Sequence, residues 1–150
     1  MRLRPIGHLE TPFAGIADCP RNGRQLDPAP ECLAVVDPPY QPGLASIEGF
    51  SHLILLYWLG PQGDALTITP PFDGVERGVF ATRAPLRPNP IGLSVVAFAG
   101  SAGPGRLRVR YLDCRTGTPL LDIKPYLPST DAEPGADMGW LAPHRTRRPE

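Results

Sequence analysis

The stretch Leu93-Ser-Val-Val-Ala-Phe-Ala-Gly-Ser-Ala-Gly-Pro-Gly-Arg-Leu-Arg-Val-Arg-Tyr111 predicts a β-hairpin. Residues 93–99 are apolar on both faces, as in a buried strand. In the last six residues arginine alternates with Leu107, Val109 and Tyr111, a period of two that is typical of a half-exposed strand. The glycine-rich segment 100–105 suits the turn. Because it leads into a strand and not a helix, a dinucleotide-binding loop is not expected.

Working outward, six more short apolar segments are predicted as strands: 6–13, 33–36, 50–59, 66–69, 78–82 and 120–123. One turn of helix is expected at 44–49. The chain has 21 prolines and 16 glycines in 150 residues, and proline inside a helix costs about 3 kcal/mol, so long helices are nearly excluded. The fold class is therefore all-β, a small single-sheeted antiparallel β-barrel with long Pro/Gly-rich loops.

One domain is expected over 1–150, with a core at about 6–131 and a loosely structured tail at 132–150. In that tail only Trp140 and Leu141 are strong anchors. A barrel this small encloses few interior cavities, so the functional site is expected at a rim or between subunits.

Charge and cysteine usage limit the function classes. Fifteen basic and fifteen acidic residues cancel, which argues against strong non-specific nucleic-acid binding but leaves room for a local patch. The three cysteines have no metal-ligand spacing, so reduced thiols and no metal are expected. The amino terminus does not resemble a signal peptide, and the apolar runs are far shorter than the roughly 20 residues that span a bilayer. A cytoplasmic protein without a membrane segment is expected.

The segment 80–92, Phe-Ala-Thr-Arg-Ala-Pro-Leu-Arg-Pro-Asn-Pro-Ile-Gly, is a candidate binding loop. Its three prolines fix φ and bias the residues before them to extended geometry. Arg83, Arg87 and Asn89 are thereby presented from a stiff backbone, which suits a carboxylate or phosphate ligand. A rigid structural loop with exposed arginines explains the same residues equally well.

A second cluster joins the 116–119 loop to Asp122-Ile-Lys-Pro-Tyr126. Alternation places Asp122 and Lys124 on one face of a strand, where they can pair. Tyr126 joins them if the strand continues through 125. The competing interpretation is an ordinary surface pair beside a packing tyrosine. A third cluster, residues 20–22, is compatible with any loop.

Together these motifs resemble the TsaA-like family, also called TrmO. The resemblance rests on Cys19-Pro-Arg-Asn-Gly, Gly49-Phe-Ser-His52, Gly78-Val-Phe-Ala-Thr-Arg83, Arg87-Pro-Asn-Pro-Ile-Gly92, Gly117-Thr-Pro119 and Asp122-Ile-Lys-Pro-Tyr126, and it spans about Ile6 to Asp131. It implies a homodimeric β-barrel that binds S-adenosylmethionine and methylates threonylcarbamoyladenosine beside the tRNA anticodon. The implied cofactor contacts are Pro20, Arg21, Asn22, Arg83, Leu93, Thr116, Gly117, Thr118 and Pro119. One departure is Gly60-Pro61, where some members carry polar residues.

For such a reaction the acceptor nitrogen needs a base near its proton. Asp122 is the candidate, with Lys124 setting its charge and Tyr126 stacking on or hydrogen-bonding the base. Arg87 and Asn89 are expected to bind the threonyl carboxylate. Family members often continue into a further carboxy-terminal domain, so two alternatives stay open: a methyltransferase for a small molecule, or a non-catalytic S-adenosylmethionine-binding module.

Overall fold

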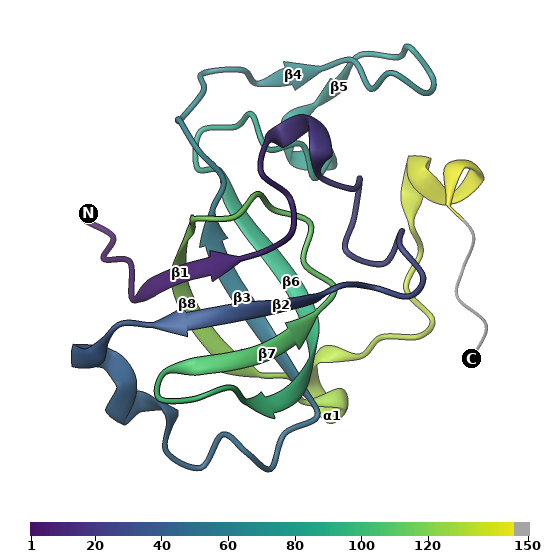
Figure 1. Cartoon of the computed structure of the whole chain (residues 1–150). Coiled ribbons are helices and arrows are strands. Elements are labelled where there is room, and N and C mark those ends of the chain that lie inside the picture. Colours follow the sequence, from purple (N-terminus) through teal and green to yellow (C-terminus); the bar gives the residue numbers. More distant parts are fainter. Residues whose placement is uncertain (146–150) are drawn as a thin grey trace.

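Six antiparallel strands form a closed barrel in a computed structural model that describes residues 1–145 (Figure 1). Around the barrel the order is β1-β2-β7-β6-β3-β8. The strands are β1 (Gly7–Glu10), β2 (Glu31–Val36), β3 (His52–Trp58), β6 (Ile91–Ser101), β7 (Arg106–Arg110) and β8 (Thr118–Pro125). The predicted fold class is therefore confirmed.

The barrel interior is filled by side chains from alternate positions of every strand. Buried and partly buried residues alternate along β3 and β7, and the sequence predicted this alternation for β7. The fully buried interior residues are Leu9, Ala34, Leu53, Leu55, Val96, Val109 and Leu120. Each leucine removed from water stabilises the fold by about 1.5–3 kcal/mol. This core fixes the strand ends from which the loops emerge.

Two local predictions were wrong. Residues 78–82 do not form a strand: β5 (Arg77–Gly78) ends at Gly78, and Val79–Ala81 is a 3-10 helix whose Val79 carbonyl accepts from the Thr82 amide and hydroxyl. The helical turn expected at 44–49 occurs earlier, at Pro38–Leu44, because prolines at its start suit the first turn. The short strand predicted at 66–69 is present as β4 (Thr67–Ile68) and pairs with β5 outside the barrel.

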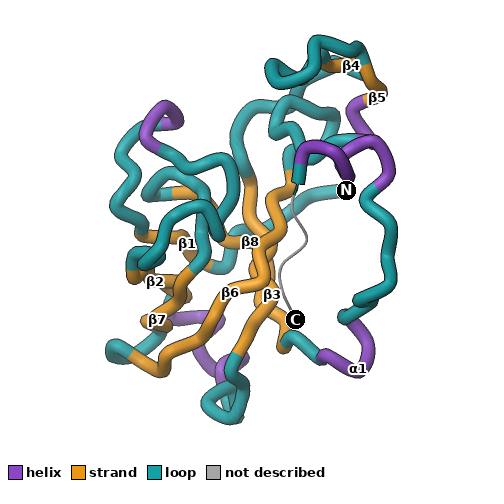
Figure 2. Tube along the Cα trace, turned by 90° about the vertical axis from the view of Figure 1, so that its right-hand side faces the viewer, coloured by secondary structure: helices purple, strands orange, loops and turns teal. Residues whose placement is uncertain are grey.

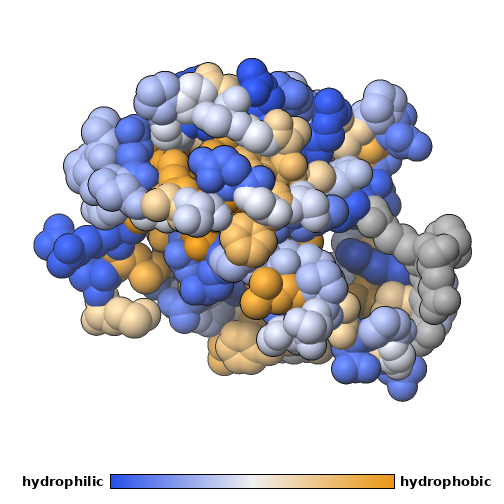
Figure 3. All heavy atoms as spheres, turned by 90° about the horizontal axis from the view of Figure 1, so that it is seen from below, coloured by the Kyte–Doolittle hydropathy of each residue, from blue (hydrophilic) through white to orange (hydrophobic). Residues whose placement is uncertain are grey.

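The two ends of the barrel differ. At one end, the loop mouth, three long connections meet: residues 11–30, 59–90 and 111–117. The opposite end carries the short β6–β7 hairpin and the Pro38–Leu44 helix, and Leu44 and Ile47 pack there against the core. Seen from below, hydrophobic and hydrophilic atoms are interspersed on the surface (Figure 3). Recognition of a ligand is therefore expected at the loop mouth.

The carboxy-terminal segment returns from α1 (Pro128–Asp131) to the β4–β5 hairpin (Figures 1 and 2). Its 3-10 helix, Gly139–His144, is held by Trp140, whose ring stacks on Phe72 at 5.8 Å and whose Nε1–H donates to the Ala81 carbonyl at 2.8 Å. Part of the predicted tail, 146–150, lies outside the described residues. No helix in the described part of the chain is long and apolar enough to cross a membrane.

Candidate functional site

A cleft of about 270 Å³ opens at the loop mouth, and we call it the rim cleft. Its walls come from the 21–22 loop, the 83–87 loop, the start of β6 and the end of β3. The residues that line it are Arg21, Asn22, Tyr57, Leu59, Arg83, Ala84, Arg87, Ile91, Gly92, Leu93, Asp113 and Arg145. Four of the nine residues predicted to bind a cofactor, Arg21, Asn22, Arg83 and Leu93, thus meet in one cavity.

The polar floor of the rim cleft was not predicted from the sequence. Tyr57 is 2% exposed, and its hydroxyl donates to Asp113 Oδ1 at 2.9 Å. The Tyr57 hydroxyl oxygen also lies 2.8 Å from the hydroxyl of buried Ser94. Since the single tyrosine proton goes to the carboxylate, Ser94 must be the donor in the second bond. The network joins β3, β6 and the 111–117 loop at one point.

Burial controls the protonation of this floor. Removal from water raises the pKa of Asp113, against the opposing effects of the Tyr57 hydrogen bond and the nearby Arg83 guanidinium. Burial, with the negative charge of Asp113 as the next cause, also raises the pKa of Tyr57 far above its ordinary value, so the hydroxyl remains a donor. A half-buried carboxylate with a raised pKa in a cleft is a feature of binding and catalytic sites.

Close packing shapes the wall beside this floor. A Cβ on Gly92 would lie 2.2 Å from Cε2 of the Tyr57 ring, so only glycine lets the two strands keep this contact. On either side of Gly92, Ile91 and Leu93 point outward and are 41% and 52% exposed. The rim cleft therefore combines an apolar edge with a carboxylate floor and arginine walls.

The proline-rich loop is braced by one of its own arginines. Arg87 Nη2 donates to the carbonyls of Val79 and Thr82 at 2.6 and 2.7 Å. Its Nε is buried and has no hydrogen-bond partner among the described residues. Arg87 thus fixes the loop from inside, while Arg83 is left exposed toward the cleft. The expected contact of Arg87 with a substrate stays a prediction.

The 116–119 loop lies against β1 and not in the rim cleft. The amides of Thr116 and Gly117 donate to the carbonyls of Phe13 and Leu9, both at 2.8 Å. Gly117 has φ +82°, which favours glycine. Thr118 is buried, with its hydroxyl donating to the Arg115 carbonyl at 2.7 Å. This loop therefore does not line the rim cleft with the arginines.

Two more predicted residues line a different hollow. Asn89 and Pro119 border a cavity of about 400 Å³ together with Trp58 and Leu121. Pro20 precedes the 21–22 wall but does not itself line the rim cleft. The structure therefore spreads the predicted binding residues over two cavities, and Pro20, Thr116, Gly117 and Thr118 line neither of them.

Asp122 and Lys124 form an ion pair with 2.8 Å between Oδ2 and Nζ, which confirms that they share a face of β8. The pairing raises the pKa of Lys124. Tyr126 follows the strand and meets the His52 ring edge-on at 6.3 Å. Asp122 is opposite Leu56, and Leu56 is opposite Leu93. At about 4.8 Å per strand, Asp122 lies about 10 Å along the outer surface from the edge of the rim cleft.

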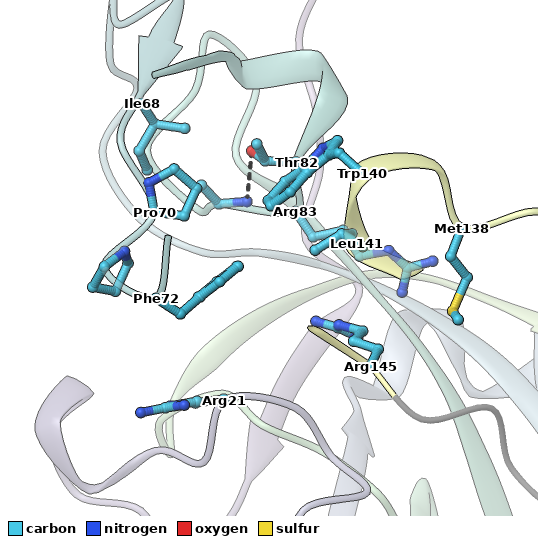
Figure 4. A pocket seen from close by; sticks show the side chains of 12 residues that line it. Arg21, Ile68, Pro70, Phe72, Thr82, Arg83, Met138, Trp140, Leu141 and Arg145 are labelled. Atoms are coloured by element: carbon cyan, nitrogen blue, oxygen red, sulfur yellow. Dashed lines mark hydrogen bonds between the residues drawn. The ribbon is translucent and has the colours of Figure 1, made fainter. Parts of the chain in front are cut away.

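Beside the rim cleft lies a second opening of about 410 Å³, which we call the strap cleft after the strap, residues 138–145, that walls it. Figure 4 shows Phe72 and Trp140 bordering the opening, with Arg21, Arg83 and Arg145 placed around it and set apart from one another. The two clefts share Arg21, Arg83, Ala84 and Arg145 in their walls and are therefore neighbours. No group of three or more His, Cys, Asp or Glu residues able to hold a metal occurs in the described part of the chain.

Comparison with known proteins shows which family this chain is similar to. The profile of the tRNA-methyltransferase O N-terminal domain matches residues 8–132. An S-adenosyl-L-methionine-binding protein of Archaeoglobus fulgidus is 46% identical over 132 residues, which cover 87% of this chain and 93% of that protein. A putative S-adenosylmethionine-dependent methyltransferase, RcsF, of Pseudomonas aeruginosa is 38% identical over 89% of this chain and 58% of its own length.

Solved structures agree with the sequence comparison. The crystal structure of TrmO from Pseudomonas aeruginosa superposes with a TM-score of 0.78 at 37% identity. The match covers 93% of this chain but only 61% of the solved one. A second TrmO crystal structure gives a TM-score of 0.74 at 36% identity. The strap lies beyond the region that the family profile covers.

Proposed function

The chain belongs to the TrmO family, and on that premise we propose that it methylates threonylcarbamoyladenosine beside the anticodon of tRNA. The cofactor is S-adenosyl-L-methionine, and the reaction is a methyl transfer. The observation that carries the proposal is the meeting of Arg21, Asn22, Arg83 and Leu93 in the rim cleft. These residues come from two loops and the start of β6, and the family resemblance names all four.

The rim cleft offers a protein contact for each of the carboxylate, the adenine and the ribose of the cofactor. Arg83 lies beside the floor with no described carboxylate at ion-pair distance, and it suits the methionyl carboxylate. Leu93 and Ile91 expose apolar surface at the rim, against which a flat adenine ring packs. Asp113 offers acceptor oxygens to hydroxyl groups of a ribose. Asn22 adds a carboxamide at the entrance.

When bound, the cofactor supplies an electrophilic methyl group on a sulfonium, so the protein contributes mainly alignment and exclusion of water. The stiff 83–90 loop holds Arg83 in place because three prolines and the Arg87 brace restrict its backbone. Tyr57 and Ser94 hold Asp113 in one orientation. The site is thereby preorganised before either ligand binds.

A base is needed for the acceptor proton, because a nitrogen that carries a carbonyl substituent is a poor nucleophile until the proton leaves. We propose Asp122 for this role, with Lys124 keeping it ionised and Tyr126 contacting the acceptor base. About 10 Å separates Asp122 from the cleft edge within one protomer. That separation is explained if the residue acts in the neighbouring subunit of a dimer.

The outer surface of the barrel supports a dimer. Six apolar side chains of β3 and β6 alternate outward there and remain at least partly exposed: Ile54, Leu56, Trp58, Ile91, Leu93 and Val95. A two-fold axis near Leu56 sets β8 of each subunit over β6 of the other. Asp122 of the partner subunit then faces Leu93 at the rim cleft.

The dimer is tested by sedimentation of wild type and Leu56→Glu. We expect wild type to sediment as a dimer and the variant as a monomer with unchanged secondary structure, because a charge on the buried interface is left unpaired. Leu66→Glu is the matched control, since Leu66 is 63% exposed elsewhere. A monomeric wild type at micromolar concentration would exclude the shared site.

The function itself is tested by methyl transfer to tRNA from a strain that lacks the modification enzyme. We expect mass spectrometry of digested tRNA to show one added methyl on threonylcarbamoyladenosine. Asp122→Asn should lower turnover with little change in cofactor affinity, whereas Arg83→Gln should weaken cofactor binding. Wild-type turnover in Asp122→Asn would remove this residue from the mechanism.

Non-catalytic binding of S-adenosyl-L-methionine is a second candidate function. It is favoured by relatives that are named only as binding proteins, including the one at 46% identity, and by the zero net charge, which offers little general attraction for RNA. The tRNA assay separates the two candidates. Cofactor binding without transfer to tRNA would favour the binding module or a small-molecule acceptor.

A further inference from the structure

The strap cleft has the charge of an anion site. Arg21, Arg83 and Arg145 line it, and none of the described residues in its wall is acidic. Other arginines of the molecule are engaged elsewhere: Arg77 pairs with Asp73 and Arg106 with Glu10. No described carboxylate forms an ion pair with any of the three that face the strap cleft. Guanidinium groups without an ion-pair partner at one opening favour a carboxylate or a phosphate.

The same cleft has the walls of a site for a flat ring. Ile68, Pro70, Pro71 and Leu141 give it an apolar lining, and Phe72 projects into it (Figure 4). Phe72 is 50% exposed although its ring stacks within 11° of parallel on Trp140. A volume of about 410 Å³ falls within the usual range of small-ligand sites, about 300–1,000 Å³.

The strap is held in place by its own contacts. The Arg77 guanidinium lies 3.8 Å from the centre of the Trp140 ring, on which Phe72 also stacks. Trp140 also donates to the Ala81 carbonyl, and His144 Nε2 lies 3.6 Å from Asp73 Oδ2. The strap lies outside residues 8–132, the part matched by the family profile. The strap is therefore a built wall of the site.

We propose that the strap cleft binds the acceptor nucleotide, with its base against Phe72 and an attached anion on Arg145 and Arg21. This proposal rests on the proposed methyltransferase function and names the position of its acceptor. The strap cleft and the rim cleft are both lined by Arg83 and Ala84. Donor and acceptor therefore lie side by side, as a direct displacement requires. The anion is either a flanking phosphate or the threonyl carboxylate.

The test uses the fluorescence of Trp140. Trp58 is the other of the two tryptophans, so the full chain with Trp58→Phe reports on the strap alone. Adenosine 5′-monophosphate should quench it saturably, and Arg145→Gln should weaken that binding about tenfold. Arg108→Gln is the matched control, because Arg108 on β7 is partly exposed and contacts the Ser101 carbonyl and Glu31, away from the strap cleft. Its affinity should stay within about twofold of wild type.

Three ligands identify the anion. Adenosine should bind about tenfold more weakly than its monophosphate if the arginines hold a phosphate. Threonylcarbamoyladenosine without phosphate should match the monophosphate if they hold the carboxylate. Equal affinity for all three ligands, or unchanged binding in Arg145→Gln, overturns the assignment of the arginines.

S-adenosylhomocysteine, measured by calorimetry, separates this proposal from the function on which it rests. Saturation with it should leave the affinity for the monophosphate unchanged, because the two clefts hold different ligands. Competition between the two would show a single site and overturn the proposal. Heat with S-adenosylhomocysteine but no quenching by the monophosphate refutes the acceptor site alone. Quenching without that heat refutes the proposed function and leaves an anionic-nucleotide site.

Discussion

Tyr57→Phe tests the floor of the rim cleft, because it removes one oxygen and leaves the ring in place against Gly92. Two hydrogen bonds are lost, one to Ser94 and one to the Asp113 carboxylate. A neutral bond contributes about 1 kcal/mol and one to a charged group about 1.5–3 kcal/mol. Together these bonds contribute about 2.5–4 kcal/mol. Since Asp113 borders the cleft and can recruit water in place of the tyrosine hydroxyl, we expect a smaller net loss of about 2 kcal/mol.

Urea unfolding at neutral pH measures this loss, and the melting temperature should fall by roughly 4–8 °C. Ser94→Ala is the matched comparison, because it removes the neutral bond only and should cost about half as much. Tyr57→Phe should also raise the pKa of Asp113 further, since the Tyr57 hydroxyl favours the ionised carboxylate. Carboxyl NMR of Asp113 reports that shift. Unchanged stability together with an unchanged pKa would refute the network.

Three further predictions follow from the site and the strap. Gly92→Ala places a Cβ against the Tyr57 ring, so it should destabilise by about 1–3 kcal/mol in urea unfolding; a neutral effect would contradict the close packing. Asp113→Asn should remove a pH dependence of the free energy of unfolding. Because burial raises the folded pKa of Asp113, wild type loses stability as the pH rises through that pKa. Stability curves that stay parallel for the two proteins across this pH range would count against the prediction. Trp140→Ala should speed hydrogen exchange of residues 138–145 while changing the global unfolding free energy by less than about 1 kcal/mol; unchanged exchange would mean that Trp140 does not hold the strap.

Much of the barrel was predictable because its strands show their period in the sequence. The alternation of arginine with Leu107 and Val109 reappears as the pattern of β7. Tyr111 was placed in the same strand, but its φ of +81° ends β7 at Arg110. The segment 78–82 was misassigned because a β-branched and an aromatic residue also fit a 3-10 turn when the loop around them supplies the hydrogen bonds.

The site was only partly predictable. Family motifs named Arg21, Asn22, Arg83 and Leu93, and these meet in one cleft. Tyr57 was missed because it stands in an apolar run and reads as a core residue. Asp113 was missed because its partner, Tyr57, is 56 residues away in sequence. Such pairings depend on barrel register, which local patterns do not encode.

The position of the strap could not be predicted from the sequence either. Trp140 was recognised as an anchor, but its partners Phe72 and Arg77 come from the excursion between β3 and β6. Nothing in residues 132–145 indicates that they wall a cleft. Contacts between a chain end and a distant loop follow from the tertiary fold and not from propensity.

Calorimetric titration of the full chain with S-adenosyl-L-methionine tests whether the arginine-lined rim cleft holds this cofactor. We predict one binding event per protomer, weakened about tenfold by Arg83→Gln and unaffected by Arg108→Gln. Saturable heat that Arg83→Gln leaves unchanged would place the cofactor elsewhere. No heat in the wild-type protein would contradict the assignment of the rim cleft.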